Sequence, residues 1–215
     1  DVAPSRGLGD VYKRQVCILA SLAFGKHVYP NQVETEGITN ITLEDVSYIE
    51  NAGGVIKLLG QIKYINDNEI AAFVSPAVVY NGSQLASVKD VFNAILVRGD
   101  AVGDVCFYGP GAGKLPTASA VVADIIDCAK HSERKKIFGW GAGNEDYVVD
   151  YKERIEMPFY VRAKATPAEI NAKFSDVKFL SRKGQPSDEV AFITDIMTEN
   201  KLNKKLDGIN VINTI

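Results

Sequence analysis

The C-terminal part of the chain carries the pattern that most restricts its fold. Strand-like runs occupy 157–165, 176–182, 190–194 and 210–215, and helix-like segments occupy 167–174 and 197–206. The order of these segments is β-α-β-β-α-β, which is the split arrangement of ferredoxin-like domains. We therefore predict a small ferredoxin-like domain over residues 155–215.

The chain before this domain alternates between helix-like and strand-like segments. In Thr42–Ala52, apolar residues recur at helical spacing behind Thr42, and Asp45 follows three residues later, as in a capped helix with an acidic first turn. Two strand-like runs, Val55–Ile65 and Glu69–Tyr80, flank the turn composition Asn66-Asp-Asn68. This composition predicts that the two runs form an antiparallel hairpin.

The next segments extend the alternation. Residues 85–97 are typical of an amphipathic helix or a helix–strand mixture, and 101–108 of a strand. Residues 116–130 predict a helix with one apolar face, formed by Ala118, Val121, Val122, Ile125 and Ile126. We predict an α+β fold in which a mixed sheet with helices on one face occupies residues 16–130. Residues 131–154 then form a linker or ordered loop before the domain at 155–215.

Residues 1–15 differ in composition from the rest of the chain. They combine glycine, proline and charged residues without a periodic apolar face, and Val16 then opens a buried helix abruptly. The string Gly7–Gln15 also resembles translated sequencing adapter. We expect residues 1–15 to be a non-native or disordered leader, and a native flexible leader is the alternative.

Charge and apolar runs exclude several classes of function. Lysine plus arginine at 24 against aspartate plus glutamate at 27 give a net charge of -3, which offers no electrostatic reason to expect a nucleic-acid partner or an anionic membrane. The longest apolar runs, 16–24 and 118–126, are too short to span a membrane. Cys17, Cys106 and Cys128 form no CxxC pair, which favours buried free thiols in a reducing compartment. We expect a soluble, cytoplasmic protein.

The strongest local motif is the glycine loop Gly109-Pro-Gly-Ala-Gly113, between a predicted strand and the helix opened by Pro116. Such a loop lets backbone N–H groups approach an anion or a planar ring. It is not a Walker loop, because Leu115 follows Lys114 where serine or threonine is needed, and its GxGxG spacing differs from the dinucleotide fingerprint. A ligand-contacting loop and a tight strand-to-helix turn both stay open.

Other residues that could carry chemistry form weaker patterns. His27 and His131 have no cysteine or carboxylate at a recognised ligand spacing, so we predict no metal site. Asp10 and Lys13 favour an exposed ion pair over an acid–base pair. A second glycine cluster, Gly139–Gly143 around Trp140, favours a linker anchored by the indole.

Several separated blocks agree, in order, with one enzyme family. The blocks are Ile18–Gly25, Glu36–Asp45, Val55–Gly60, Asn93–Ala94, Gly99–Asp104 and Phe107–Val122. Over roughly Val16–Ala129 the chain resembles the catalytic domain of homoserine dehydrogenase. The tail from Met157 to Ile215 resembles the C-terminal ACT domain of many bacterial members.

The resemblance implies an N-terminal Rossmann domain, a substrate domain whose mixed sheet also forms the dimer interface, and in some members the ACT tail. Such enzymes reduce aspartate semialdehyde to homoserine with NAD(P)H, in threonine and methionine biosynthesis. The glycine loop is the cofactor-binding feature that carries over, at Gly109, Gly111 and chiefly Gly113, which matches a glycine near the nicotinamide.

The chain also departs from the family pattern. The family's catalytic lysine falls on Gln15, and the aspartate four residues earlier falls on Val11, so no catalytic residue carries over. The substrate-binding glutamate and the monovalent-cation loop of the family lie further upstream. In the ACT-like tail, Thr166-Pro-Ala-Glu169 replaces the family's Asp-x-Pro-Gly ligand loop.

We therefore expect part of an oxidoreductase that uses NAD(P) and a small substrate, homoserine or aspartate semialdehyde. We expect a homodimer or higher homo-oligomer, an amino-acid effector, and no nucleic-acid or membrane partner. Because glutamine cannot donate the proton that the family's lysine supplies, we expect this chain alone to be inactive. The alternative is a non-catalytic module for dimerisation and amino-acid sensing.

Overall fold

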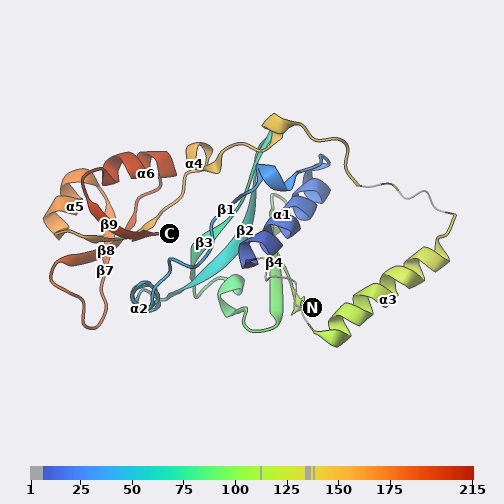
Figure 1. The fold of residues 1–215 in the computed structure, drawn as a ribbon, viewed down its shortest axis with the longest axis horizontal. Helices are drawn as coiled ribbons and strands as arrows, with labels where there is room; N and C mark the ends of the chain where they lie inside the picture. The colour runs from blue at the N-terminus through green and yellow to red at the C-terminus, as the bar shows by residue number, and fades with distance from the viewer. Residues whose placement is uncertain (1–6, 112, 134–136, 138) are drawn as a thin grey trace. The chain divides into compact units, whose positions relative to one another are not determined.

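The computed structural model describes residues 7–111, 113–133, 137 and 139–215, and for Leu8 the backbone only (Figure 1). Contacts divide the chain into two compact units. The major unit joins residues 1–78 to 139–215, and the inserted unit is 79–138. These units are divided at other residues than the domains predicted from the sequence, whose bounds are 1–15, 16–130, 131–154 and 155–215.

The major unit opens with helix α1, Leu8–Phe24, which ends at Gly25 in the left-handed conformation (Figure 1). The prediction that the first helix starts at Val16 was wrong. Residues 8–15 contain no proline, and Tyr12 packs half-buried against the core cluster that contains Val16 and Ala20. Residues 1–6 of the predicted leader lie outside the described residues.

A three-stranded sheet lies next to α1. Its strands β1 (Glu34–Thr35), β2 (Gly54–Asn66) and β3 (Glu69–Tyr80) have the order β1-β3-β2, and the 3-10 helix η1 (Pro30–Gln32) precedes β1. The backbone N–H of Asn68 donates to the side chain of Asn66 at 2.9 Å in the two-residue turn between β2 and β3. The predicted hairpin is confirmed, because two strands that pair across so short a turn must be antiparallel.

Helix α2, Leu43–Asn51, separates β1 from β2 and begins where the sequence predicts. Thr42 is its N-cap, and the Asp45 side chain accepts hydrogen bonds from the Thr42 backbone N–H at 3.0 Å and hydroxyl at 3.1 Å. This capping box satisfies donors of the first turn and fixes the helix start.

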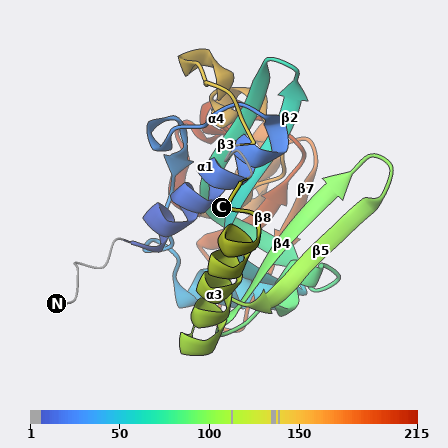
Figure 2. The same ribbon diagram turned by 90° about the vertical axis from the view of Figure 1, so that its right-hand side faces the viewer.

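The inserted unit consists of a hairpin and a long helix. It contains the 3-10 helix η2 (Gln84–Ser87), strands β4 (Phe92–Gly99) and β5 (Gly103–Pro110), which pair antiparallel (Figure 2), and α3 (Lys114–Lys130). Of the helix or helix–strand mixture predicted at 85–97, the mixture is nearer to the structure, because η2 covers residues 85–87 and β4 begins at Phe92. The β-branched residues Ile95 and Val97 favour pairing with β5. The predicted helix at 116–130 is confirmed, although α3 buries none of its described residues.

Residues 139–154 pack back onto the major unit and contain η3 (Glu145–Tyr147) and α4 (Tyr151–Arg154). Backbone bridges join Gly141 to Lys26 and Val148 to Ile70. Tyr147 is 2% exposed and belongs to the core beside α1. This stretch is therefore an ordered part of the core, and the simple linker was the less accurate of the two expectations.

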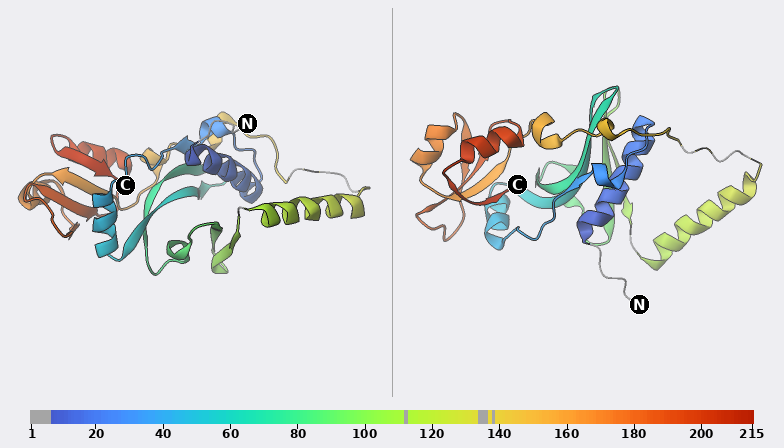
Figure 3. Two further views of the ribbon diagram at one scale, coloured as in Figure 1. Left: turned by 60° about the horizontal axis from the view of Figure 1, so that its bottom comes forward. Right: turned by 45° about the horizontal axis from the view of Figure 1, so that its top comes forward.

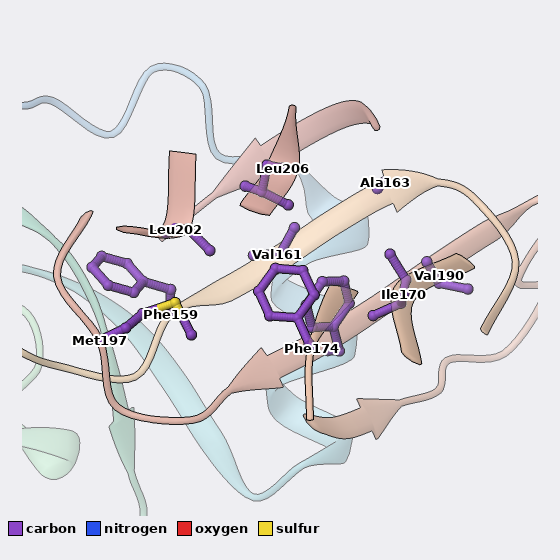
Figure 4. Close-up of a cluster of buried hydrophobic side chains, with 10 residues drawn as sticks. Phe159, Val161, Ala163, Ile170, Phe174, Val190, Met197, Leu202 and Leu206 are labelled. Carbon is purple, nitrogen blue, oxygen red and sulfur yellow. The ribbon is translucent and has the colours of Figure 1, made fainter. Parts of the chain in front are cut away.

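The C-terminal residues form the predicted β-α-β-β-α-β arrangement. The elements are β6 (Tyr160–Lys164), α5 (Pro167–Lys173), β7 (Val177–Leu180), β8 (Glu189–Thr194), α6 (Glu199–Leu206) and β9 (Asn210–Thr214). Their sheet has the order β7-β8-β6-β9, and each neighbouring pair is antiparallel. A core of ten buried residues, Phe192 among them, fills the space between the sheet and its helices, with Phe174 and Val161 near its centre (Figure 4).

Candidate functional site

The glycine loop follows β5 directly, and each of its described glycines has a different structural role. Gly109 pairs with Asn93 in the hairpin, and a Cβ there would meet open space. The backbone N–H of Gly111 donates to the Val91 carbonyl at 3.0 Å, and a Cβ at Gly111 would lie 1.6 Å from the Asn93 side-chain nitrogen. Ala112 lies outside the described residues.

Gly113 has φ of 122° and ψ of 159°, which residues with a Cβ rarely adopt. The structure therefore supports the turn interpretation at this position. Gly113 is also the N-cap of α3 and provides no side-chain cap, while the first helical hydrogen bond runs from Thr117 N–H to its carbonyl at 3.2 Å. The start of α3 is exposed, and Leu115 is 83% exposed. An uncapped helix start of this kind can accept an anion, so both interpretations remain compatible with the geometry.

A second candidate surface lies on α1. Val11, Gln15 and Ile18 share one exposed helix face with Asp10 and Arg14, around a shallow depression of about 280 Å³. Leu22 continues the same face and is 55% exposed. The positions to which the resemblance assigns the family's lysine and aspartate, Gln15 and Val11, are thus brought together at the surface.

Trp140 anchors the second glycine cluster, as the expectation of an anchoring indole stated. The indole N–H of Trp140 donates to Nδ1 of His27 at 2.9 Å, and the His27 ring contacts Tyr29 edge-on at 4.3 Å between centroids. Gly143 is needed for this approach, because a Cβ there would lie 1.9 Å from the His27 carbonyl oxygen. A depression of about 360 Å³ lies nearby, lined by Tyr29, Asn31, Gln32, Gly143, Asn144 and Glu145.

Apart from Asp10 on the α1 surface, the remaining sequence candidates line neither of the two depressions. His131 contacts Asp127 on α3 at 2.9 Å, and no ion pair joins the described Asp10 and Lys13. No group of metal-ligating side chains occurs among the described residues. Cys17 is buried, but Cys106 is half-buried and Cys128 exposed, so the expectation of buried thiols holds for Cys17 only. None of the helices, as far as they are described, is both long and apolar enough to cross a membrane.

Sequence reasoning missed a buried charge network in the major unit. Arg162 on β6 places Nε 2.8 Å from Oδ1 of Asp45 on α2, and their side chains are 6% and 0% exposed. Nη1 of Arg162 also lies 3.4 Å from Glu189 on β8. The signal in the sequence was a single arginine within an apolar strand, which gives no information about its partner.

Hydrogen bonds satisfy the carboxylates of this network. Asp45 accepts a hydrogen bond from the Tyr160 hydroxyl at 2.9 Å and another from the Asn213 side-chain amide at 2.8 Å, while the Tyr48 hydroxyl donates to Glu189 at 2.8 Å. Burial opposes ionisation of Asp45, yet the hydrogen bonds from Thr42, Asn213 and Tyr160, together with Arg162, hold the pKa of its carboxyl below the usual value. Burial and the neighbouring Glu189 raise the pKa of Tyr48 to about 12.

Comparison with known proteins identifies the relatives of this chain. The family model described as homoserine dehydrogenase matches residues 9–126. The homoserine dehydrogenase of Bacillus subtilis is 40% identical over 118 residues, which cover 55% of this chain and 27% of that protein. The enzyme of Helicobacter pylori is 37% identical over 157 residues, covering 73% of this chain and 36% of that protein.

Solved structures agree over a longer stretch. A homoserine dehydrogenase from Thiobacillus denitrificans superposes with a TM-score of 0.77 at 28% identity, covering 100% of this chain and 54% of that one. The homoserine dehydrogenase of S. aureus at pH 7.0 gives a TM-score of 0.76 at 28% identity and 55% of its length. The chain thus spans about half of these structures and a smaller share of the curated relatives. With the family model covering more than half of its residues, this chain belongs to the homoserine dehydrogenase family.

Proposed function

We propose that this chain is the substrate and assembly portion of an oxidoreductase that interconverts aspartate semialdehyde and homoserine with NAD(P)H. The observation that carries the proposal is the family match over residues 9–126, which includes β5, the glycine loop and most of α3. The domain boundaries 16–130 and 155–215 remain part of this proposal. A non-native origin for residues 1–15 also remains part of it, although the family match begins at residue 9.

The glycine loop has the features that a nicotinamide cofactor needs from this chain. Gly109, Gly111 and Gly113 present no side chains, the start of α3 has no side-chain cap, and Lys114 follows at once. Backbone N–H groups there can approach a ring or an anion closely. When bound, NAD(P)H supplies the hydride, and this loop would hold and orient its nicotinamide side.

The residues on the exposed face of α1 explain why we expect this chain alone not to catalyse the reaction. Reduction of the aldehyde needs an acid that delivers a proton to the oxygen as the hydride arrives at the carbon. At the family's lysine position stands Gln15, whose amide does not donate a proton in this way, and at the aspartate position stands the apolar Val11. We propose that both residues face the substrate site without acting in the chemistry.

Residues 155–215, called the C-terminal unit from here on, support the alternative of a sensing module. Their strand order is that of a ferredoxin-like domain, and we propose that they form an ACT domain. One observation weighs against amino-acid binding at the start of α5. The Thr166 hydroxyl accepts from the Glu169 N–H at 3.3 Å, and the Glu169 carboxylate accepts from the Thr166 N–H at 2.7 Å. These groups hydrogen-bond to one another, so fewer free donors and acceptors remain there for a ligand.

Assembly and location complete the proposal. Exposed apolar residues on the hairpin of the inserted unit, including Ile95, Val97 and Phe107, favour contact with a second copy of the chain. We propose a homodimer or larger homo-oligomer that acts in the cytoplasm, where NAD(P) and the small-molecule substrate occur together.

Homoserine oxidation with NAD⁺ or NADP⁺ tests the catalytic part of the proposal. We expect the chain alone to give no rate above a control without enzyme, while the Bacillus subtilis relative turns over in the same assay. Turnover by this chain would contradict the roles given to Gln15 and Val11. A melting temperature that rises with threonine or another amino acid would favour the sensing module instead.

A further inference from the structure

Helix α2 covers the face of the C-terminal sheet that α5 and α6 leave open. Along β6, Val161 and Ala163 point to the core beneath α5 and α6, whereas Tyr160 and Arg162 point to the opposite face. Alternation of this kind is the normal period of a strand. Figure 3 shows α2, in light blue, beside the orange strands of this sheet in both views.

The contact between α2 and the sheet has an apolar part. Tyr48 and Ile49 of α2 are 0% exposed and cluster with Tyr160, Leu180 and Ala191 of the sheet. The Asn51 side chain also donates to the Ser181 carbonyl at 3.1 Å. The second half of the helix is therefore packed on the sheet.

The buried charge network also joins α2 to the sheet. Arg162 reaches Asp45 near the start of α2, and Glu189 accepts from Tyr48 in the next turn and from Arg182 at 2.9 Å. The Arg162 guanidinium also donates to the Thr42 hydroxyl at 3.0 Å. Separating α2 from the sheet would break the Asp45–Arg162 pair and leave Asp45 without its cation, whereas Glu189 would keep Arg162 and Arg182. Breaking a buried ion pair in this way is strongly destabilising.

The connection from α2 to the rest of the major unit is short. Helix α2 ends at Asn51, Gly53 turns with φ of 79°, and β2 begins at Gly54. A link this short gives α2 little freedom to move independently of β2.

We propose that α2 and the C-terminal sheet form one cooperative body, closed by the Asp45–Arg162–Glu189 network, and that the C-terminal unit acts on the β1-β3-β2 sheet through α2. Any ligand or partner that displaces the C-terminal sheet would then move β2 as well. This inference does not depend on the proposed enzymatic activity.

Native-state hydrogen exchange on the full chain tests this coupling, with the amides of 43–51, 160–164 and 189–194 as probes. We expect Arg162→Met to accelerate exchange in all three segments by the same factor, on the order of 100-fold, because they open together. Arg98→Met is the matched control, since Arg98 forms an exposed ion pair with Asp104 in the inserted unit at 2.6 Å. This control should leave the three segments unchanged.

Two results would overturn the proposal. One is faster exchange in 160–164 and 189–194 while 43–51 keeps its wild-type rate, and the other is no change in any of the three. If Arg162→Met fails to fold, Tyr160→Phe decides instead, because it removes only the hydroxyl that donates to Asp45. We expect a common acceleration of about tenfold in that variant, and unequal factors would refute the coupling.

Discussion

Replacing Gly113 by alanine separates a backbone requirement from a binding role in the glycine loop. At φ of 122° and ψ of 159°, a residue with a Cβ is strained, and such strain costs about 1–3 kcal/mol. The new Cβ would meet Pro116 Cδ at 3.5 Å, which is an ordinary contact, so the cost comes from the backbone alone. We therefore expect Gly113→Ala to destabilise the inserted unit without any steric clash.

Gly109→Ala is the matched control, because a Cβ at Gly109 meets open space and its φ is not positive. Hydrogen exchange of the β4 and β5 amides, compared at one pH and temperature, measures the difference. A cost of about 1–3 kcal/mol corresponds to exchange that is roughly 5-fold to 150-fold faster in Gly113→Ala than in the control. Equal rates in the two variants would refute the backbone argument and leave cofactor contact as the reason for this glycine.

The other predictions concern α1 and the buried carboxylate. Deleting residues 1–15 removes the first turns of α1 and the half-buried Tyr12, so we expect the melting temperature by circular dichroism to fall by about 2–8 °C for a loss of about 1–2 kcal/mol. An unchanged melting temperature would support the leader interpretation. Because the pKa of Asp45 is lowered in the folded chain, its stabilisation is complete above the unfolded value near 3.8 and is lost as pH falls through the folded pKa. Urea midpoints between pH 2 and pH 6 should therefore fall less steeply in Asp45→Asn than in the wild type, and parallel curves would contradict the assignment.

Elements with local signals could be predicted from the sequence. The start of α2 follows from Thr42 and Asp45, which satisfy each other within one turn. The order of strands and helices in the C-terminal unit could be predicted because the spacing of its apolar residues changes regularly between that of a strand and that of a helix. The strand at 92–99 was predicted only as part of a possible helix–strand mixture, because its apolar residues also fit helical spacing and only pairing with β5 decides between helix and strand.

Features that depend on distant partners could not be predicted. Arg162 and Asp45 meet through folding although 117 residues separate them, so nothing near either residue indicates the pair. The helical start at Leu8 depends on Tyr12 packing against a core that includes Val33 and Ile70. For the candidate site, the glycine loop was located from its spacing, but the backbone angle that makes glycine necessary at Gly113 is visible only in the structure.

A chimera tests the central claim most directly. The nucleotide-binding half of the Bacillus subtilis relative is joined ahead of Val11 of this chain, and homoserine-dependent reduction of NAD(P)⁺ is measured with and without Val11→Asp and Gln15→Lys. We predict turnover in the doubly substituted chimera and a rate at least about 100-fold lower in the unsubstituted one, since a positioned acid contributes a factor of that order. Equal rates in the two chimeras, or no turnover in either, would contradict the account.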